Sequence, residues 1–320
     1  MSETLAVVVP VYNETAVLEV FHQRLSAVLA DCDMPYQVLY VDDGSDTAFL
    51  DQLQRLRDGD PHVAVLELSR NFGREVALSA GLDHADADAV VVIDADLQDP
   101  PELIPRFIAE WRRGYDVVYG QRVARRGESA VKRHSAGLFY RLLAYLSEVE
   151  IPRNVGDFRL LSRRAVAALN ALPERHRYMK GLYAWIGFPQ KGIEYVRQPR
   201  AAGQSKWTYP RLWNLALEGI TSFSAAPLKM ATYLGLVTSS LAFLYGAFML
   251  IRTLLYGNPV PGYPSLVIII LFLGGVQLIC LGIIGEYLAR TYQESKGRAL
   301  YFLKGYHPAG GAGSARQERN

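Results

Sequence analysis

The chain has 320 residues, which is enough for one or two domains. Its 34 lysine and arginine residues nearly balance its 32 aspartate and glutamate residues, and the net charge of +2 argues against a nucleic-acid partner. The two cysteines, Cys32 and Cys280, have no Cys or His neighbour at metal-ligand spacing, so we expect neither a disulfide framework nor a zinc site.

The first 120 residues alternate short β-rich segments with amphipathic helical patterns. Strands are expected at residues 5–9, 37–41, 63–68, 89–93 and 116–119. Helices are expected at residues 14–30, 47–57, 74–84 and 101–113. This order predicts a mainly parallel α/β sheet, and ligands of such sheets bind beyond the carboxyl ends of the strands.

Polar residues follow all five expected strands, in the segments 10–14, 42–45, 69–73, 94–98 and 120–122. After the fourth strand, Asp94 and Asp96 alternate about an alanine, and Gln98 follows closely. Oxygen ligands in an open site suit Mg²⁺ or Mn²⁺, which keep several waters and also bind substrate phosphates. Two structural alternatives stay open, because residues 99–101 could simply cap the next helix and residues 42–45 could form a turn with an N-cap.

Motifs of several other enzyme classes are missing from the sequence. No Gly-x-Gly-x-x-Gly follows the first strand and no Gly-x4-Gly-Lys-Ser/Thr occurs, so the usual phosphate cradles of dinucleotide-binding and P-loop proteins are absent. There is no Gly-x-Ser-x-Gly, and none of the six histidines stands at an expected strand end, which argues against a hydrolase. Without such a cradle, a metal ion would have to bind any diphosphate. The pattern therefore favours metal-assisted group transfer.

Two uncharged segments, 231–251 and 265–285, each have the roughly 20 residues that a bilayer-spanning helix needs. The turn-rich segment 256–264 joins them, which predicts a transmembrane hairpin rather than two buried core helices. Basic residues flank the outer ends of the hairpin, whereas only Arg252 borders its loop, so we expect both termini in the cytoplasm. The N-terminus lacks the features of a signal peptide, and the residues after Tyr306 are expected to be disordered.

Apolar residues recur at helical spacing in 134–147 and again in 207–223, just before the first span. Either stripe could belong to the core, but both lie beside basic residues, and we expect helices that lie in the membrane interface. The predicted order is a cytoplasmic catalytic domain at 1–208, an interfacial helix at 209–229, a transmembrane hairpin at 230–290 and a cytoplasmic tail at 291–320.

Four motifs occur in an order that resembles a known family: Val-Pro-Val-Tyr-Asn-Glu at 9–14, Val-Asp-Asp-Gly-Ser at 41–45, Asp-Ala-Asp-Leu-Gln-Asp-Pro-Pro at 94–101 and Gly-Asp-Phe-Arg at 156–159. They resemble the family-2 glycosyltransferases with a Rossmann-like GT-A fold. More narrowly, they resemble the polyprenyl-phosphate glycosyltransferases, which include bacterial undecaprenyl-phosphate (bactoprenol) glucosyltransferases and relatives of dolichol-phosphate mannose synthase. Segments 203–207, 223–228 and 281–287 resemble the bacterial branch, so the likeness extends over nearly the whole chain.

The resemblance implies roles for individual residues. It assigns four residues to the nucleoside of a nucleotide sugar: Pro10, Tyr12, Glu14 and Asp43. It implies that Asp94 contacts the donor, that Asp96 and Gln98 bind Mg²⁺ or Mn²⁺ on its diphosphate, and that Asp157 faces the reacting sugar. Arg200 and Lys206 lie in a stretch with four basic residues and no acidic one, and the resemblance makes this stretch a cover over the diphosphate. A solvated or lipid-facing basic loop is the alternative.

The acceptor in this family is a phosphate monoester on a long isoprenoid. Its second pKa is about 6, so most of it is a nucleophilic dianion near neutral pH and a general base is not obviously required. We therefore expect Asp157 to orient sugar hydroxyls or to balance positive charge at the anomeric carbon, with proton abstraction as the second choice. The candidates for binding the acceptor phosphate are Arg122, Arg133 and Lys132, because basic side chains pair with phosphate oxygens.

Together with the sequence patterns, the resemblance implies an inverting, metal-dependent transferase that places one sugar, glucose from UDP-glucose, onto undecaprenyl phosphate at the bacterial inner membrane. A UDP-modified arabinose, UDP-GlcNAc or GDP-mannose donor is the alternative within the class. A catalytically silent membrane scaffold, partnering a flippase or a second glycosyltransferase, is the alternative from another class. The sequence also leaves open whether the protein forms a homo-oligomer. The missing Gln-x-x-Arg-Trp motif and the small number of spans disfavour a processive polymerase.

Overall fold

The computed structural model describes residues 3–123, 152, 155–175, 177–196, 226–257 and 262–311. The chain divides into two compact units, one containing residues 1–140, 149–212 and 298–320, and the other containing residues 141–148 and 213–297. Four predicted site residues, Lys132, Arg133, Arg200 and Lys206, lie outside the described residues, as do both predicted interfacial stripes.

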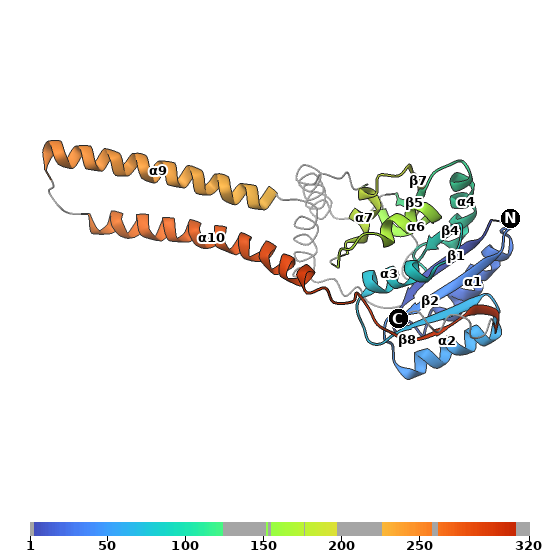
Figure 1. Ribbon diagram of the computed structural model, residues 1–320. Coiled ribbons are helices and arrows are strands. Elements are labelled where there is room, and N and C mark those ends of the chain that lie inside the picture. Colours follow the sequence, from blue (N-terminus) through green and yellow to red (C-terminus); the bar gives the residue numbers. More distant parts are fainter. Residues whose placement is uncertain are drawn as a thin grey trace. The chain divides into compact units, whose positions relative to one another are not determined.

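The first unit is built on an eight-stranded mixed sheet with the order β7-β5-β6-β4-β1-β2-β3-β8 (Figure 1). The strands are β1 Leu5–Val11, β2 Tyr36–Asp42, β3 Val63–Leu68, β4 Ala89–Val92, β5 Val117–Arg122, β6 Val155–Ser162, β7 Gln190–Tyr195 and β8 Leu303–His307. β4, β1, β2 and β3 run parallel to one another, and β5 is parallel to β7. β6 is antiparallel to both β4 and β5, and β8 is antiparallel to β3.

Helices connect these strands and cover the sheet. They are α1 Leu18–Ala30, α2 Thr47–Gly59, α3 Arg74–His84, the 3₁₀ helix η1 Pro101–Leu103, α4 Ile104–Arg112, α6 Arg163–Asn170 and α7 Met179–Trp185. The central strands are buried along their whole length, which explains their continuous runs of Val, Leu and Ala. The mainly parallel α/β sheet predicted from the sequence is confirmed, with antiparallel pairing on both sides of the interior strand β6 and at the edge strand β8.

Three predicted boundaries in this part differ from the structure. The first helix begins at Leu18 instead of residue 14, because residues 12–17 form a bend and a turn. The predicted helix 101–113 divides into η1 and α4, with Pro105 in the first turn of α4, where a missing N–H costs no hydrogen bond. Residues 120–122 were expected to follow a strand, but they are the last three residues of β5 because they continue its pairing with β7.

α3 packs closely on the sheet at Gly81. A Cβ atom there would overlap Val8 Cγ1 and lie 3.0 Å from Val41 Cγ2. We expect Gly81→Ala to destabilise the protein by about 1–3 kcal/mol through overpacking, despite the better helix propensity of alanine. Unfolding of the full chain in detergent measures this effect. Gly59→Ala, at the exposed end of α2 with open space around it, is the matched control, and equal stability of the two variants would contradict the packing argument.

The chain returns to the sheet after the last long helix. β8 pairs with β3, the Ser69 N–H donates to Phe302 O at 2.9 Å, and the Glu67 carboxylate contacts His307 Nε2 at 2.9 Å and Lys304 Nζ at 3.3 Å. A 3₁₀ helix, η2 Ala309–Gly311, follows. The expectation of disorder directly after Tyr306 is therefore wrong for residues 307–311, because backbone pairing to a buried strand and a carboxylate contact hold this segment in place.

The second unit contains two long helices that pack against each other, α9 Ala226–Tyr256 and α10 Tyr263–Ser295 (Figure 1). Segments Pro227–Tyr256 and Ile268–Ser295 have mean hydropathies of 1.9 and 2.6, and their side chains are almost entirely exposed. A soluble core helix would be buried, so length, composition and exposure together indicate association with a membrane. The helices extend beyond the predicted spans 231–251 and 265–285 at both ends.

Candidate active site

The loops after β1 and β2 are joined to each other at the carboxyl edge of the sheet. The Asn13 N–H donates to Ser45 Oγ at 3.0 Å, and the Asp46 N–H donates to Asn13 Oδ1 at 3.0 Å. Asn13 has a φ of 52°, a conformation that asparagine adopts more readily than most residues. Three of the residues predicted to hold the nucleoside lie at the end of β1 or directly after it. Pro10 is buried within β1, Tyr12 is 47% exposed, and Glu14 is half-buried.

Asp43 fastens the loop that leads into α3. Its two carboxylate oxygens accept the N–H groups of Phe72 at 2.7 Å and Gly73 at 2.9 Å. Burial raises the pKa of Asp43, and these two hydrogen bonds oppose that shift. Gly44, with a φ of 73°, lies so close to the Arg70 backbone that no side chain would fit. This contact fixes the start of α3, where Arg74 is the first residue.

Arg74 bridges two carboxylates that are distant in the sequence. Its Nε and Nη2 donate to Asp94 Oδ1 at 3.0 and 2.6 Å, and its Nη1 donates to Asp157 Oδ2 at 2.8 Å. Asp94 follows β4 and Asp157 lies near the start of β6; because these strands are antiparallel neighbours, both residues reach the same edge. The two carboxylates predicted to meet the sugar donor therefore share one guanidinium group.

The shared guanidinium affects the two carboxyl groups differently. Burial raises the pKa of Asp94, and Arg74 offsets only part of this rise. Burial would also raise the pKa of Asp157, but Arg74, Lys180 and Arg159 together outweigh it and hold the pKa below its usual value. Asp157 is therefore ionised near neutral pH, as a residue that balances positive charge must be. Its Oδ1 is buried and accepts no hydrogen bond from any of the described residues.

The segment after Asp94 presents its polar side chains toward one side. Asp94, Asp96 and Gln98 are half-buried, whereas the alternate residues Ala95 and Leu97 are buried. Leu97 has a φ of 61°, and Asp96 Oδ1 accepts the Gln98 N–H at 3.0 Å, so the segment is a tight turn. Among the described residues, no three His, Cys, Asp or Glu side chains form a cluster that could hold a metal ion. An ion here would depend on few protein ligands and on substrate oxygens.

Arg122, the last residue of β5, lies against the face of β6 that is opposite to Asp157. Its Nε donates to the Tyr195 hydroxyl at 3.0 Å, its Nη2 is 3.5 Å from Asp99 Oδ1, and that hydroxyl donates to the same Asp99 oxygen. A side chain at Gly156 would overlap the Arg122 guanidinium. Since successive strand residues point to opposite faces, Gly156 shares its face with Arg122 and not with Asp157. Arg122 therefore already has a carboxylate partner.

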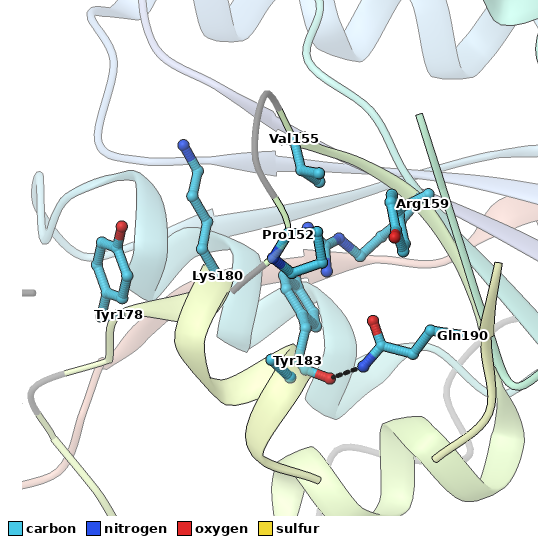
Figure 2. A pocket seen from close by; sticks show the side chains of 9 residues that line it. Pro152, Val155, Arg159, Tyr178, Lys180, Tyr183 and Gln190 are labelled. Carbon is cyan, nitrogen blue, oxygen red and sulfur yellow. Dashed lines mark hydrogen bonds between the residues drawn. The ribbon is translucent and has the colours of Figure 1, made fainter. Parts of the chain in front are cut away.

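A small pocket lies between β5, β6, β7 and α7 (Figure 2). The Arg159 guanidinium stacks over the Tyr183 ring at 3.5 Å, and Arg159 Nη2 donates to Gly156 O at 2.8 Å. Gln190 Nε2 donates to Tyr183 O at 2.8 Å. Val155 and Arg159 of β6 line this pocket and Asp157 lies between them in the same strand, so the pocket lies beside the Asp94–Arg74–Asp157 group.

Comparison with known proteins places this arrangement in a family. The sequence pattern described as Glycosyl transferase family 2 matches residues 6–169, and the pattern described as GtrB C-terminal hairpin matches residues 226–291. The chain belongs to glycosyltransferase family 2. The predicted family and the predicted enzyme class are therefore confirmed.

Similar proteins cover nearly the full length of this glycosyltransferase. An uncharacterized glycosyltransferase of Synechocystis is 50% identical over 95% of each chain. A bactoprenol glucosyl transferase of Shigella phage SfV is 49% identical over 94% of this chain and 98% of its own. The crystal structure of glucosyl-3-phosphoglycerate synthase from Mycobacterium tuberculosis, in complex with Mn²⁺, UDP and phosphoglyceric acid, has a TM-score of 0.50 at 20% identity and covers 68% of this chain and 76% of its own. This last likeness confirms the GT-A fold.

Five residues of the candidate site were not predicted from the sequence: Arg74, Glu75, Arg159, Lys180 and Tyr183. Arg74 and Glu75 directly follow the strand-end segment 69–73, and Arg159 belongs to the Gly-Asp-Phe-Arg motif, so a weak signal existed for these three. α7 carries Lys180 and Tyr183, and no motif marks it. Its residues join the site only because β6 and α7 pack together.

Glu75 supplies a pH-dependent contribution to stability. Its Oε2 is buried without a hydrogen-bond partner among the described side chains, and its Oε1 is 3.6 Å from Arg74 Nη1. Burial, reinforced by the Asp157 charge, raises the pKa of Glu75 to about 7. The folded protein then binds more protons at this group than the unfolded chain, whose glutamates ionise at about 4.3, so this contribution to stability falls as pH rises between the two values.

We expect Glu75→Gln to remove this dependence, because glutamine mimics the protonated acid at every pH. Melting temperatures of both proteins at pH 5 and pH 8 measure the effect. The melting temperature of the variant, relative to that of the wild type, should be higher at pH 8 than at pH 5. Glu194→Gln, at an exposed carboxylate of β7, is the control. Parallel melting curves for wild type and Glu75→Gln across this range would contradict the assignment.

Proposed function

We propose that this glycosyltransferase transfers one sugar from a nucleotide sugar to a polyprenyl phosphate, with inversion of configuration and with the help of a divalent metal ion. The proposed donor is UDP-glucose and the proposed acceptor is undecaprenyl phosphate. The observation that carries the proposal is the Asp94–Arg74–Asp157 group at the edge of a GT-A sheet, in a chain with two exposed apolar helices of membrane-spanning length. Relatives named bactoprenol glucosyl transferase, 46–49% identical to this chain, support the acceptor class.

The donor would lie along the carboxyl edge of β1, β2 and β4. Four residues are proposed to hold the nucleoside: Pro10, Tyr12, Glu14 and Asp43. The exposed Tyr12 ring is accessible for this role, whereas Asp43 would act both on the nucleoside and through the loop it fastens. Arg200 and Lys206, outside the described residues, are proposed to cover the diphosphate.

The residues Asp96 and Gln98 fit a divalent metal ion. Mg²⁺ and Mn²⁺ take oxygen ligands and are often bound by one or two carboxylates together with substrate phosphates, which matches an open segment with few acidic side chains. Such an ion, when bound, stabilises the negative charge that grows on the departing diphosphate. The chain itself positions Asp94 and Asp157 for the sugar, with Arg74 holding both carboxylates in place.

A phosphate dianion needs no base to attack the anomeric carbon. The proposed role of Asp157 is therefore to orient sugar hydroxyls and to balance positive charge at that carbon. Arg122, Lys132 and Arg133 are proposed to contact the acceptor phosphate, which for Arg122 requires exchanging part of its pairing with Asp99. The proposed location is the bacterial inner membrane, with both termini in the cytoplasm.

Incubation of the purified protein with undecaprenyl phosphate, Mg²⁺ or Mn²⁺ and a panel of nucleotide sugars tests the proposal. The panel contains UDP-glucose, UDP-GlcNAc, a UDP-modified arabinose and GDP-mannose, and the mass of the lipid is measured. A mass gain of one hexose with UDP-glucose is expected. A gain with a different donor would correct the donor, and no product with any donor would favour a scaffold without catalytic activity.

A further inference from the structure

The chain returns from α10 to the sheet of the first unit through residues 298–307, which we call the return segment. It contains β8, the edge strand drawn in red in Figure 1. α10 ends at Ser295, and Gly297, with a φ of 62°, turns the chain out of the helix. Only two residues separate α10 from the return segment, which belongs to the same compact unit as the sheet. Its contacts are therefore closely linked along the chain to the apolar hairpin.

The return segment contacts the end of β3, where the loop 69–73 begins. The Ser69 N–H, directly after β3, donates to Phe302 O at 2.9 Å. Glu67 of β3 is 5% exposed, and two basic side chains of β8 contact its carboxylate, the nearer at 2.9 Å. A buried carboxylate that lost these partners would destabilise the end of β3. The return segment therefore fixes the position from which the loop 69–73 leaves the sheet.

The return segment also contacts the end of α3, the helix that follows this loop. The Tyr301 hydroxyl donates to Asp83 Oδ2, in the last turn of α3, at 2.9 Å. The ring of His84, the last residue of α3, lies 6.2 Å from the ring of Tyr301 and 6.0 Å from that of Tyr306. Burial, reinforced by the Asp83 charge, raises the pKa of Tyr301, so its hydroxyl stays protonated and remains a donor near neutral pH. One segment thus holds both the loop before α3 and the end of α3.

α3 has Arg74 at one end and the contact with Tyr301 at the other. The helix contains 11 residues and is therefore about 16 Å long. It makes a close contact with the sheet at Gly81, which is two positions from Asp83 and seven from Arg74. Because packed elements transmit displacements, a helix that tilts about this contact moves further at Arg74 than at Asp83. A small shift at the Tyr301 contact is consequently enlarged at the end of α3 that holds the two carboxylates.

We propose that the return segment positions Arg74, and through it Asp94 and Asp157, by holding the loop before α3 and the end of α3. Tyr301 is then a positioning residue for the transfer reaction, which acts through α3 and not on the substrate. This inference rests on the proposed function, because it takes Asp157 as the carboxylate that acts on the sugar. It makes the geometry of the active site depend on a segment that directly follows the apolar hairpin.

Hydrogen exchange in the full chain in detergent tests the contact without turnover. Tyr301→Ala removes the hydroxyl and the ring, and Tyr301→Phe removes the hydroxyl alone. Phe302→Ala is the matched control, because this ring is 61% exposed and alanine keeps the backbone bond to Ser69. The amides of residues 72–77 should exchange about tenfold faster in Tyr301→Ala, less so in Tyr301→Phe, and at the wild-type rate in the control. Faster exchange confined to residues 80–84, an equal effect in the control, or no change would overturn the proposal.

Turnover tests whether the effect passes through Arg74. Tyr301→Ala should lower kcat for transfer from UDP-glucose about 10- to 100-fold, the effect of a small misplacement, with UDP binding and the KM for undecaprenyl phosphate unchanged. Arg74→Lys loses the fork that bridges the two carboxylates, so in that background Tyr301→Ala should change kcat by less than about twofold. Equal losses in both backgrounds would overturn the positioning role. If the wild type transfers no sugar to lipid, the proposed function fails, whereas hydrogen exchange still decides whether the return segment holds α3.

Discussion

Asp157→Asn is expected to lower the rate of sugar transfer by about 100- to 1000-fold, the effect typical of removing one electrostatic group from a transition state. Asparagine keeps the shape of the side chain, but it loses the charge that Arg74 Nη1 contacts at 2.8 Å. The site then carries one negative charge fewer while positive charge develops at the anomeric carbon. The turnover number at saturating donor and acceptor measures the loss.

The control for this variant is Asp86→Asn, at an exposed carboxylate that forms a surface ion pair with Arg163. It should turn over like the wild type. Full activity of Asp157→Asn would show that the carboxylate shared with Arg74 does not act on the sugar. The site would then have to be sought elsewhere along the sheet edge.

Asp96→Asn is expected to lower metal-dependent turnover by more than about 100-fold while leaving the fold intact. Loss of a residue that only supports a metal ligand typically costs 10- to 100-fold, so loss of a ligand should cost more. Asp96 is half-buried, and an asparagine Oδ1 can still accept the Gln98 N–H, so the turn itself is preserved. Turnover across a Mn²⁺ titration and an unchanged melting temperature measure the two parts of this prediction. Wild-type turnover would exclude Asp96 as a ligand.

The central strands could be predicted from the sequence because burial on both faces leaves a continuous apolar run. β1 to β4 were all placed within two residues of their observed ends. β6, β7 and β8 were not predicted. Gln-Lys-Gly-Ile-Glu-Tyr and Leu-Lys-Gly-Tyr-His contain glycine and charged residues, and these edge strands form through backbone pairing with β5 and β3 rather than through an apolar pattern.

The candidate site likewise contains residues that could be predicted from the sequence and residues that could not. Asp94 and Asp96 directly follow a strong strand pattern, and the GT-A resemblance drew attention to Asp157. Their connection through Arg74 was not predictable, because it joins residues 83 positions apart and depends on the antiparallel pairing of β4 and β6. Lys180 has no local motif and reaches the site only through the packing of α7 on β6.

The most direct measurement is the position of manganese in crystals of the protein grown with UDP and Mn²⁺, located by its anomalous scattering. We expect the ion at Asp96 and Gln98, in contact with the UDP diphosphate, at the edge of the sheet that carries Asp94 and Asp157. An ion bound at other side chains, or UDP bound at this edge without an ion, would contradict it.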